Sequence, residues 1–86
     1  MRNGLITYIN GDQEYYSNGL LHRENGPAAI YKKYIKYYNM DQLHRLDGPA
    51  VESTDGNGKE YWVYGKKLTK EQHNLLYSTI KLKGSL

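Results

Sequence analysis

Leu21-His22-Arg23-Glu24-Asn25-Gly26-Pro27-Ala28 is followed, 22 positions later, by Leu43-His44-Arg45-Leu46-Asp47-Gly48-Pro49-Ala50. The two stretches contain both prolines of the chain, and each is preceded at the same distance by an aromatic pair, Tyr15-Tyr16 or Tyr37-Tyr38. A period of this length is typical of arrays in which one small unit is stacked on the next. The sequence therefore predicts a repeat protein.

The repeat also sets the domain organisation. Tyr61-Trp62 begins a partial third copy, in which Leu68 takes the place of the histidine. Because 86 residues are near the lower limit for one hydrophobic core, we expect a single domain over residues 1–86. Its expected parts are an opening hairpin (1–19), a first repeat (15–36), a second repeat (37–60), the partial repeat (61–68) and a capping helix (69–83).

Turn signals divide the repeats into short strands. Asn10-Gly11 and Asn18-Gly19 indicate hairpins, because both residue types tolerate the positive φ of a type I′ turn. Asp55-Gly56-Asn57-Gly58 and Lys32-Lys33 take the turn role later in the chain, whereas Met40-Asp41 replaces an expected Asn-Gly. Each Gly-Pro pair interrupts strand pairing, since proline has no N–H. We predict an all-β fold, a twisted antiparallel meander of hairpin repeats with about six or seven short strands.

The aromatic pairs are expected to form two columns across such a sheet. Successive side chains of a strand point to opposite faces. One column would then contain Tyr15, Tyr37 and Tyr61, and the other Tyr16, Tyr38 and Trp62. We expect the column with Trp62 to pack inward. The chain has ten Tyr, one Trp and no Phe, so the core is expected to consist largely of Tyr, Leu, Ile and Trp.

A helix is predicted at the C-terminal end of the array. Thr69-Lys70-Glu71-Gln72 fits a capping box, with Thr69 as the N-cap and Gln72 reaching back to it. Leu75, Leu76 and Ile80 then fall on one helical stripe. The pattern predicts an amphipathic helix over Lys70–Lys81 that covers the open end of the array.

Composition excludes several classes of protein. The chain has no cysteine, which rules out disulfides and thiolate metal sites. It has neither an apolar run of about 20 residues, as a membrane span requires, nor the basic and apolar pattern of a signal peptide. We expect a cytoplasmic protein without a membrane partner, and its Tyr-rich surface leaves homo-oligomerisation open.

Basic residues are clustered although the net charge is only +3. Lysines and aromatic rings alternate in the first cluster, and the second lies near the expected helix. The candidate binding residues are Lys32, Lys33, Tyr34, Lys36, Tyr37, Lys66, Lys67 and Lys70. Lysines interleaved with rings can pair with phosphates and stack on bases, but they can equally protect a strand edge from aggregation. Both interpretations stay open.

The recurring His-Arg pairs are interpreted as structural. The residues concerned are His22, Arg23, Gly26, Pro27, His44, Arg45, Gly48 and Pro49. They recur together with the Gly-Pro turn, and we expect His and Arg to hydrogen-bond the loop carbonyls that this turn leaves unpaired. The histidine spacing matches no metal-ligand pattern, and no nucleophile motif is present. We expect no catalytic residues, no metal, no cofactor and no enzymatic activity.

Residues Tyr15–Ala28 and Tyr37–Ala50 resemble units of a repeat family found in tailed phages and large DNA viruses, which is often described as a variant of the MORN repeat. The unit reads Tyr-Tyr-x-Asn-Gly-x-x-His-Arg-x-Asp-Gly-Pro-Ala. The resemblance implies a β-hairpin array and the cytoplasm of an infected host.

A small basic member of such a family is expected to be a phage accessory protein. The leading hypothesis is a non-enzymatic counter-defence protein that binds and inhibits a host protein or ribonucleoprotein, such as a toxin–antitoxin ribonuclease. One alternative is a self-assembling structural module. The other is a protein that binds single-stranded RNA.

Overall fold

The structure is a computed structural model that describes residues 1–82, so position 83, assigned above to the capping helix, lies outside the described residues. The elements are β1 (Gly4–Thr7), β2 (Gln13–Ser17), β3 (Leu20–Leu21), β4 (Ala29–Ile30), β5 (Tyr34–Lys36), β6 (Tyr38–Asn39), β7 (Gln42–Leu43), β8 (Val51–Ser53), β9 (Lys59–Val63), β10 (Lys66–Leu68) and α1 (Lys70–Leu82).

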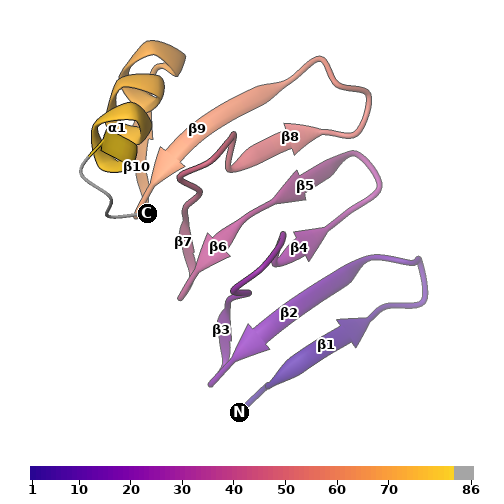
Figure 1. Ribbon diagram of the computed structural model, residues 1–86. Coiled ribbons are helices and arrows are strands. Elements are labelled where there is room, and N and C mark those ends of the chain that lie inside the picture. The colour runs from indigo at the N-terminus through magenta and orange to yellow at the C-terminus, as the bar shows by residue number, and fades with distance from the viewer. Residues whose placement is uncertain (83–86) are drawn as a thin grey trace.

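The strands form one antiparallel sheet in the order β1-β2-β4-β5-β8-β9-β10, with β3 paired to β2 and a separate β6-β7 hairpin. Figure 1 shows the strands stacked side by side, with α1 beside β9 and β10 at the end remote from the N-terminus. The all-β antiparallel prediction with one C-terminal helix is confirmed. The described residues contain more strands than expected, because one half of each long strand pairs in the main sheet and the other half pairs with β3, β7 or β10.

The sequence repeat is also a hydrogen-bond repeat. The Tyr15 amide donates to the Ala28 carbonyl at 2.7 Å, and the Tyr37 amide donates to the Ala50 carbonyl at 2.7 Å. The Asp41 amide bonds the carbonyl of the leucine before His22 at 2.8 Å, and the amide that follows Tyr64 bonds the leucine before His44 at 2.8 Å. Each unit is therefore joined to the next by the same backbone contacts.

Three two-residue turns have positive φ at both positions, as type I′ geometry requires. The φ values are 50° and 82° at Asn18-Gly19, 47° and 70° at Met40-Asp41, and 45° and 79° at Tyr64-Gly65. Met40-Asp41 forms the second hairpin turn without the Asn-Gly pair. The Asp41 carboxylate accepts the Leu21 N–H at 2.6 Å, which helps to offset the cost of left-handed backbone at non-glycine residues.

The prediction of a type I′ turn at Asn10-Gly11 is wrong. Only Gly11 has positive φ, at 93°, and its amide bonds the Tyr8 carbonyl at 2.9 Å. The Asn10 side chain accepts the Asp12 amide at 3.0 Å. The geometry is that of an ordinary turn followed by one left-handed glycine. Asn10 is held in a right-handed conformation because its side chain bonds the backbone two residues ahead.

The core contains small side chains. Among the described residues, the buried hydrophobic ones are Ala28, Ala29, Ala50 and Val51, and no large side chain is fully buried. The expectation of a core built from large residues, with the Trp62 column packed inward, is wrong, since both aromatic columns are half-buried. In a thin sheet each ring covers a small residue on a neighbouring strand and keeps its own outer side in water.

Helix α1 begins at its predicted capping box. The Thr69 amide donates to Gln72 Oε1 at 2.9 Å, and the Gln72 amide donates to Thr69 Oγ1 at 3.1 Å. His73 is 3% exposed, and its Nε2 donates to the Arg45 carbonyl at 2.7 Å. Its ring is tilted at 48° against Tyr61, with centroids 5.0 Å apart. The helix therefore seals the last strands through an aromatic and polar contact.

Candidate functional site

Each repeat arginine is clamped inside its own loop. The Arg23 guanidinium lies 4.0 Å above the Tyr15 ring, and its Nη1 donates to the Pro27 carbonyl at 3.2 Å. Arg45 lies 4.1 Å above Tyr37 and donates to the carbonyl of its own loop proline at 3.2 Å. Stacking and hydrogen bonding together fix each guanidinium against the sheet, on the side that we call the arginine face.

The glycines of the two loops leave room for these guanidinium groups. A Cβ at Gly48 would lie 2.8 Å from Arg45 Cζ, and one at Gly26 would lie 3.1 Å from Arg23 Cζ. Gly26 also has a φ of 148°, which other residues rarely adopt. The Arg-x-x-Gly-Pro spacing is thus explained by a side chain that folds back over its own turn.

The two repeat histidines hold the turns of the following units. His22 Nδ1 accepts the Met40 N–H at 3.1 Å, and His44 Nδ1 accepts the Tyr64 N–H at 2.9 Å. Their partners are backbone amides and not the predicted loop carbonyls. The His44 ring also stacks on Tyr64 with centroids 3.9 Å apart. Because Nδ1 is an acceptor in both bonds, neither histidine can carry a proton at that nitrogen without losing the turn contact.

Burial lowers the pKa of His44 below its ordinary value of 6.5, and the neighbouring His73 lowers it further. The neutral ring is therefore the form that the fold favours. His22 differs because its Nε2 lies 3.1 Å from Glu24 Oε1, whereas the residue in the same position after His44 is Leu46.

A carboxylate on the opposite face of the sheet collects tyrosine hydroxyls. Glu14 accepts hydrogen bonds from Tyr8 at 2.6 Å, Tyr16 at 2.8 Å and Tyr31 at 2.5 Å. Burial acts to raise the pKa of Glu14, but the bonds from the three hydroxyls outweigh it and lower the pKa. The bond to Glu14 is the main cause that raises the pKa of Tyr8 to about 12. The cluster joins β2 to the turns on either side of it.

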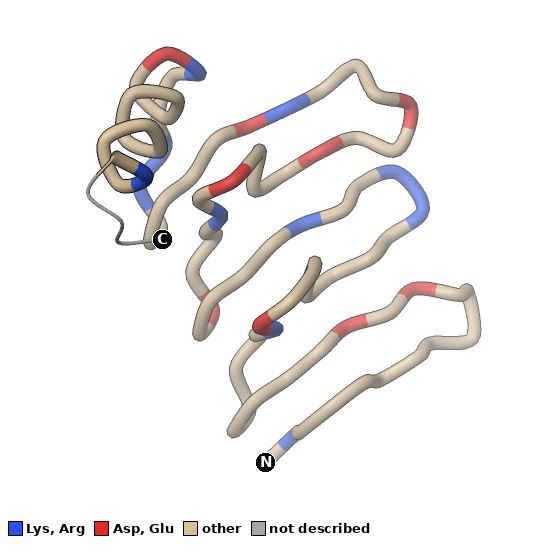
Figure 2. The backbone as a smooth tube through the Cα atoms, in the orientation of Figure 1, with Lys and Arg blue, Asp and Glu red and all other residues tan. Residues whose placement is uncertain are grey.

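The first lysine cluster lies on a turn between two interior strands. Lys32 and Lys33 are exposed and join β4 to β5, and β5 pairs with both β4 and β8. The interpretation that these lysines guard a strand edge is therefore wrong, because the strands beside them have no free edge. Figure 2 shows this basic turn between neighbouring turns that carry acidic residues.

The other candidates of the first cluster point in different directions. Tyr34 and Lys36 alternate with Ile35 along β5 and so share the face opposite to the arginines. Tyr34 is 47% exposed, and Lys36 Nζ lies 6.0 Å from the Tyr31 ring centroid. Tyr37 lies on the arginine face, where Arg45 already covers one side of its ring. The structure does not bring these side chains together as one base-stacking surface.

The second lysine cluster lies on the opposite side of the array, near α1 (Figure 2). Lys67 and Lys70 line a shallow cavity of about 450 Å³ together with Lys59. Lys66 is exposed on β10 and does not line that cavity. The two predicted basic clusters are thus separate surfaces.

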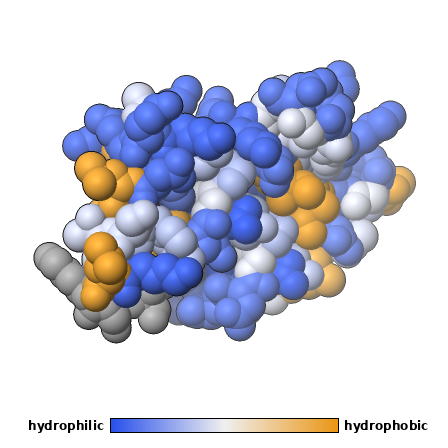
Figure 3. Space-filling model, turned by 45° about the horizontal axis from the view of Figure 1, so that its top comes forward, coloured by the Kyte–Doolittle hydropathy of each residue, from blue (hydrophilic) through white to orange (hydrophobic). Residues whose placement is uncertain are grey.

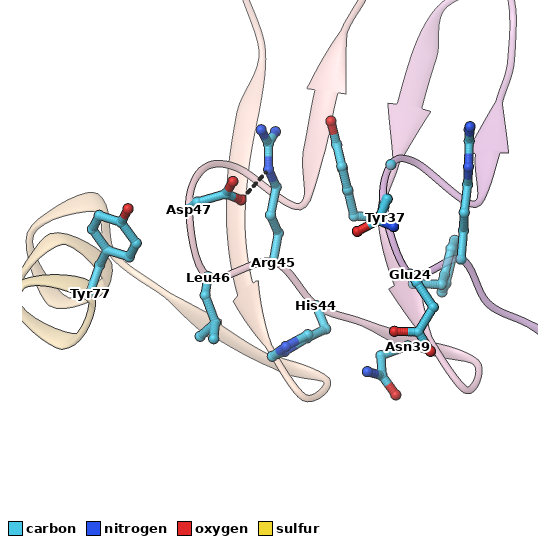
Figure 4. Close-up of a pocket in the computed structure, with 12 residues that line it drawn as sticks. Glu24, Tyr37, Asn39, His44, Arg45, Leu46, Asp47 and Tyr77 are labelled. Atoms are coloured by element: carbon cyan, nitrogen blue, oxygen red, sulfur yellow. Dashed lines mark hydrogen bonds and ion pairs between the residues drawn. The ribbon is translucent and has the colours of Figure 1, made fainter. Parts of the chain in front are cut away.

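A groove of about 520 Å³ separates the two repeat loops on the arginine face, and we call it the inter-repeat groove. The loops 23–26 and 44–47 form its sides, and Tyr37, Tyr38 and Asn39 lie between them. Figure 4 shows Arg45 beside Asp47, with Tyr77 of α1 on one side and Tyr37 on the other.

Sequence reasoning missed several residues that hold the array. Asn3 Oδ1 accepts the Asn18 amide at 2.8 Å, so Asn3 does for the first turn what His22 does for the second. Glu14 and Asp41 were not recognised either, and His73 was not predicted to be buried. No local motif marks these residues, because each acts on a different part of the chain.

Within residues 1–82, no group of three His, Asp or Glu side chains is placed to hold a metal ion. The helix of this part of the chain is not long and apolar enough to cross a membrane. No family model matches the chain, and neither a curated protein nor a solved structure shows significant similarity to it.

Proposed function

We propose that the protein is a non-enzymatic binding protein whose partner is another protein with an alternating charge pattern. The observation that carries this proposal is the turn edge, which we define as the turns 8–12, 31–33 and 54–58. In sheet order its charged residues are Asp12, then Lys32 and Lys33, then Asp55. A uniform polyanion attracted to the central turn would be repelled by the turns beside it. The pattern favours a protein partner over RNA.

The turn edge is also held in place before binding. The Thr54 amide donates to the Lys33 carbonyl at 2.9 Å, and its Oγ1 donates to the Lys32 carbonyl at 2.8 Å. Ser53 Oγ donates to Asp55 at 2.6 Å. A surface that is already ordered loses little conformational entropy on association.

The proposal includes a biological setting that rests on the sequence resemblance alone. We propose that the chain is a MORN-like repeat protein of a phage, acting in the host cytoplasm as a counter-defence inhibitor. A toxin–antitoxin ribonuclease, alone or in a ribonucleoprotein, is the class of target to test first. The regular hydrogen bonding of successive units supports the repeat part of this assignment.

Charge reversal tests the role of the turn edge. Tagged protein is used to capture partners from host lysate, with and without ribonuclease treatment. A protein partner should survive the ribonuclease and should be lost with Lys32→Glu/Lys33→Glu. The matched control is Lys66→Glu/Lys67→Glu, which changes the same charge on the opposite side of the array and should retain the partner. Loss of the partner on ribonuclease treatment would establish the RNA alternative instead.

Strand β1 favours self-association as a second candidate function. It lies at the end of the sheet order and pairs on one side only, with β2. Leu5 is 49% exposed and Ile9 is fully exposed. An open strand edge can pair with the same edge of a second copy. Sedimentation velocity should then show a dimer that Ile6→Pro dissociates, whereas a monomer at all concentrations rules this function out.

A further inference from the structure

The two repeat loops differ in one contact. Arg45 Nε donates to Asp47 Oδ1 at 2.9 Å. The residue in the same position after Arg23 is Asn25. Within residues 1–82, the structure gives Arg23 one hydrogen bond, from Nη1 to the Pro27 carbonyl. Arg23 therefore lacks the carboxylate partner that its counterpart has, although the two guanidinium groups are otherwise held alike.

The unpaired guanidinium lines the inter-repeat groove. A guanidinium has five N–H donors, and the stack on Tyr15 together with one bond to Pro27 leaves four of them for other partners. Its position is fixed before any ligand arrives. A fixed guanidinium binds a carboxylate with little further loss of side-chain entropy.

The other charged groups of the groove are already matched. Arg45 is paired with Asp47, and the Glu24 carboxylate lies 3.1 Å from His22 Nε2. Arg23 is thus the charged side chain of the groove for which the described residues supply no opposite charge. Two carboxylates nearby disfavour a doubly charged phosphate more than a singly charged carboxylate, since their repulsion grows with the ligand charge.

We propose that the inter-repeat groove is a docking site for an acidic segment of a protein partner. A partner Asp or Glu carboxylate bonds Arg23 Nε in the position that Asp47 occupies against Arg45, and the chain of the partner runs along Tyr37 between the two loops. The proposal concerns a surface on the arginine face and does not depend on the turn edge.

Exchanging the two loop residues tests the site in both directions. Asn25→Asp supplies an internal carboxylate to Arg23 and closes the site, while Asp47→Asn frees Arg45 and opens a second one. The probe is a hexaglutamate peptide, with hexaglutamine as its uncharged control. Binding is followed by NMR through the Arg23 Nε–H and Gly26 amide signals, which report this groove apart from any lysine surface.

Hexaglutamate should shift the Arg23 and Gly26 signals of the wild-type protein, and hexaglutamine should not. Asn25→Asp should weaken this binding by about tenfold or more, as expected for a lost charge-assisted hydrogen bond. Asp47→Asn should add a response at Arg45 Nε–H. Arg23→Lys should also weaken binding, because an ammonium lacks the planar fork.

Three results would overturn the proposal. One is unchanged hexaglutamate binding in folded Asn25→Asp protein, and another is equal binding of hexaglutamine. The third is inorganic phosphate shifting the same signals more strongly than the peptide, which would assign the groove to phosphate. A failure here with a normal turn-edge result would leave the proposed protein-binding function intact.

Discussion

At the residue scale, the repeat motif consists of side chains with separate mechanical tasks. Arginine covers the tyrosine of its own strand and bonds the loop proline. Glycine is required because Arg45 Cζ would lie 2.8 Å from any Cβ at Gly48. Alanine is buried beneath these groups, with Ala28 and Ala50 both 0% exposed. The motif therefore describes a folding unit and leaves none of these groups free for catalysis.

Gly48→Ala should destabilise the protein by about 1–3 kcal/mol, because the added methyl group overlaps the Arg45 guanidinium. Gly48 does not have a left-handed φ, so the loss comes from contact and not from backbone strain. Urea unfolding measures the change. In an Arg45→Ala background the same glycine substitution should cost much less. Equal costs in both backgrounds would show that the arginine is not the group that excludes a side chain.

A pH dependence follows from the buried acceptor of His44. The pKa of His44 in the folded state is lower than the ordinary value of 6.5, so the unfolded chain takes up this proton at higher pH. The stability contributed by the neutral ring is fully present above about pH 6.5 and is lost as the pH falls toward the folded-state pKa.

Unfolding free energies of the wild type and His44→Asn, measured between pH 8 and pH 5, test this expectation. Asparagine offers an acceptor oxygen to the Tyr64 N–H and does not titrate, so the variant should be less stable at neutral pH but should depend less on pH. Identical pH profiles would show that His44 is not the titrating group.

At the element scale, local and distant partners share the work of holding each turn or helix end. The Thr69-Gln72 capping box is entirely local, and α1 begins where that box lies. The Tyr64-Gly65 turn is not local in this sense, since a histidine 20 residues away accepts its first amide. Elements with local signals are therefore formed independently, whereas the turns depend on the neighbouring repeat.

Thr69→Ala should reduce stability by about 0.5–2 kcal/mol, because the Gln72 amide loses its side-chain acceptor. Thr69→Ser keeps the hydroxyl and should behave like the wild type. Thermal unfolding gives the overall change, and amide hydrogen exchange in the first turn of α1 should accelerate only in the alanine variant. Unaltered exchange there would contradict the role assigned to the capping box.

At the scale of the whole molecule, the protein is a one-dimensional array. Successive units repeat the same contacts, Asn3 closes the first turn, and α1 closes the last strands through His73. Figure 3 shows that hydrophobic residues on the viewed face form separate small patches with hydrophilic residues between them. Stability in such arrays is roughly the sum of the units and their nearest-neighbour interfaces.

Duplicating residues 23–44 in tandem should therefore give a folded and more stable protein. The inserted copy ends in a second His44, which holds the Tyr64 turn while the first one holds the inserted Met40 turn. The midpoint of urea unfolding should rise with an unchanged type of circular dichroism spectrum. An insert that carries His44→Ala and Arg45→Ala should raise it less. A drop in the midpoint with the intact insert would refute the additive description.

The sequence by itself determined the features whose causes are local. The repeat period predicts a stacked array, Asn18-Gly19 marks a type I′ turn, and Thr69 with Gln72 marks the start of the helix. Each signal depends on residues within one turn of the chain, where propensity and hydrogen-bond reach are set by sequence spacing. Even so, Asn10-Gly11 misled, because the side chain of Asn10 bonds the backbone and moves the turn by one residue.

The tertiary structure alone decided the contacts between repeats. It assigns His22 and His44 to turns of the next unit and separates the two lysine clusters. It also places Arg23 in a groove without a carboxylate partner, a difference that Asn25 and Asp47 reveal only when the two loops are superimposed in the mind as equal structures. These contacts join residues about one repeat apart. Their geometry depends on how the strands stack, which no local pattern specifies.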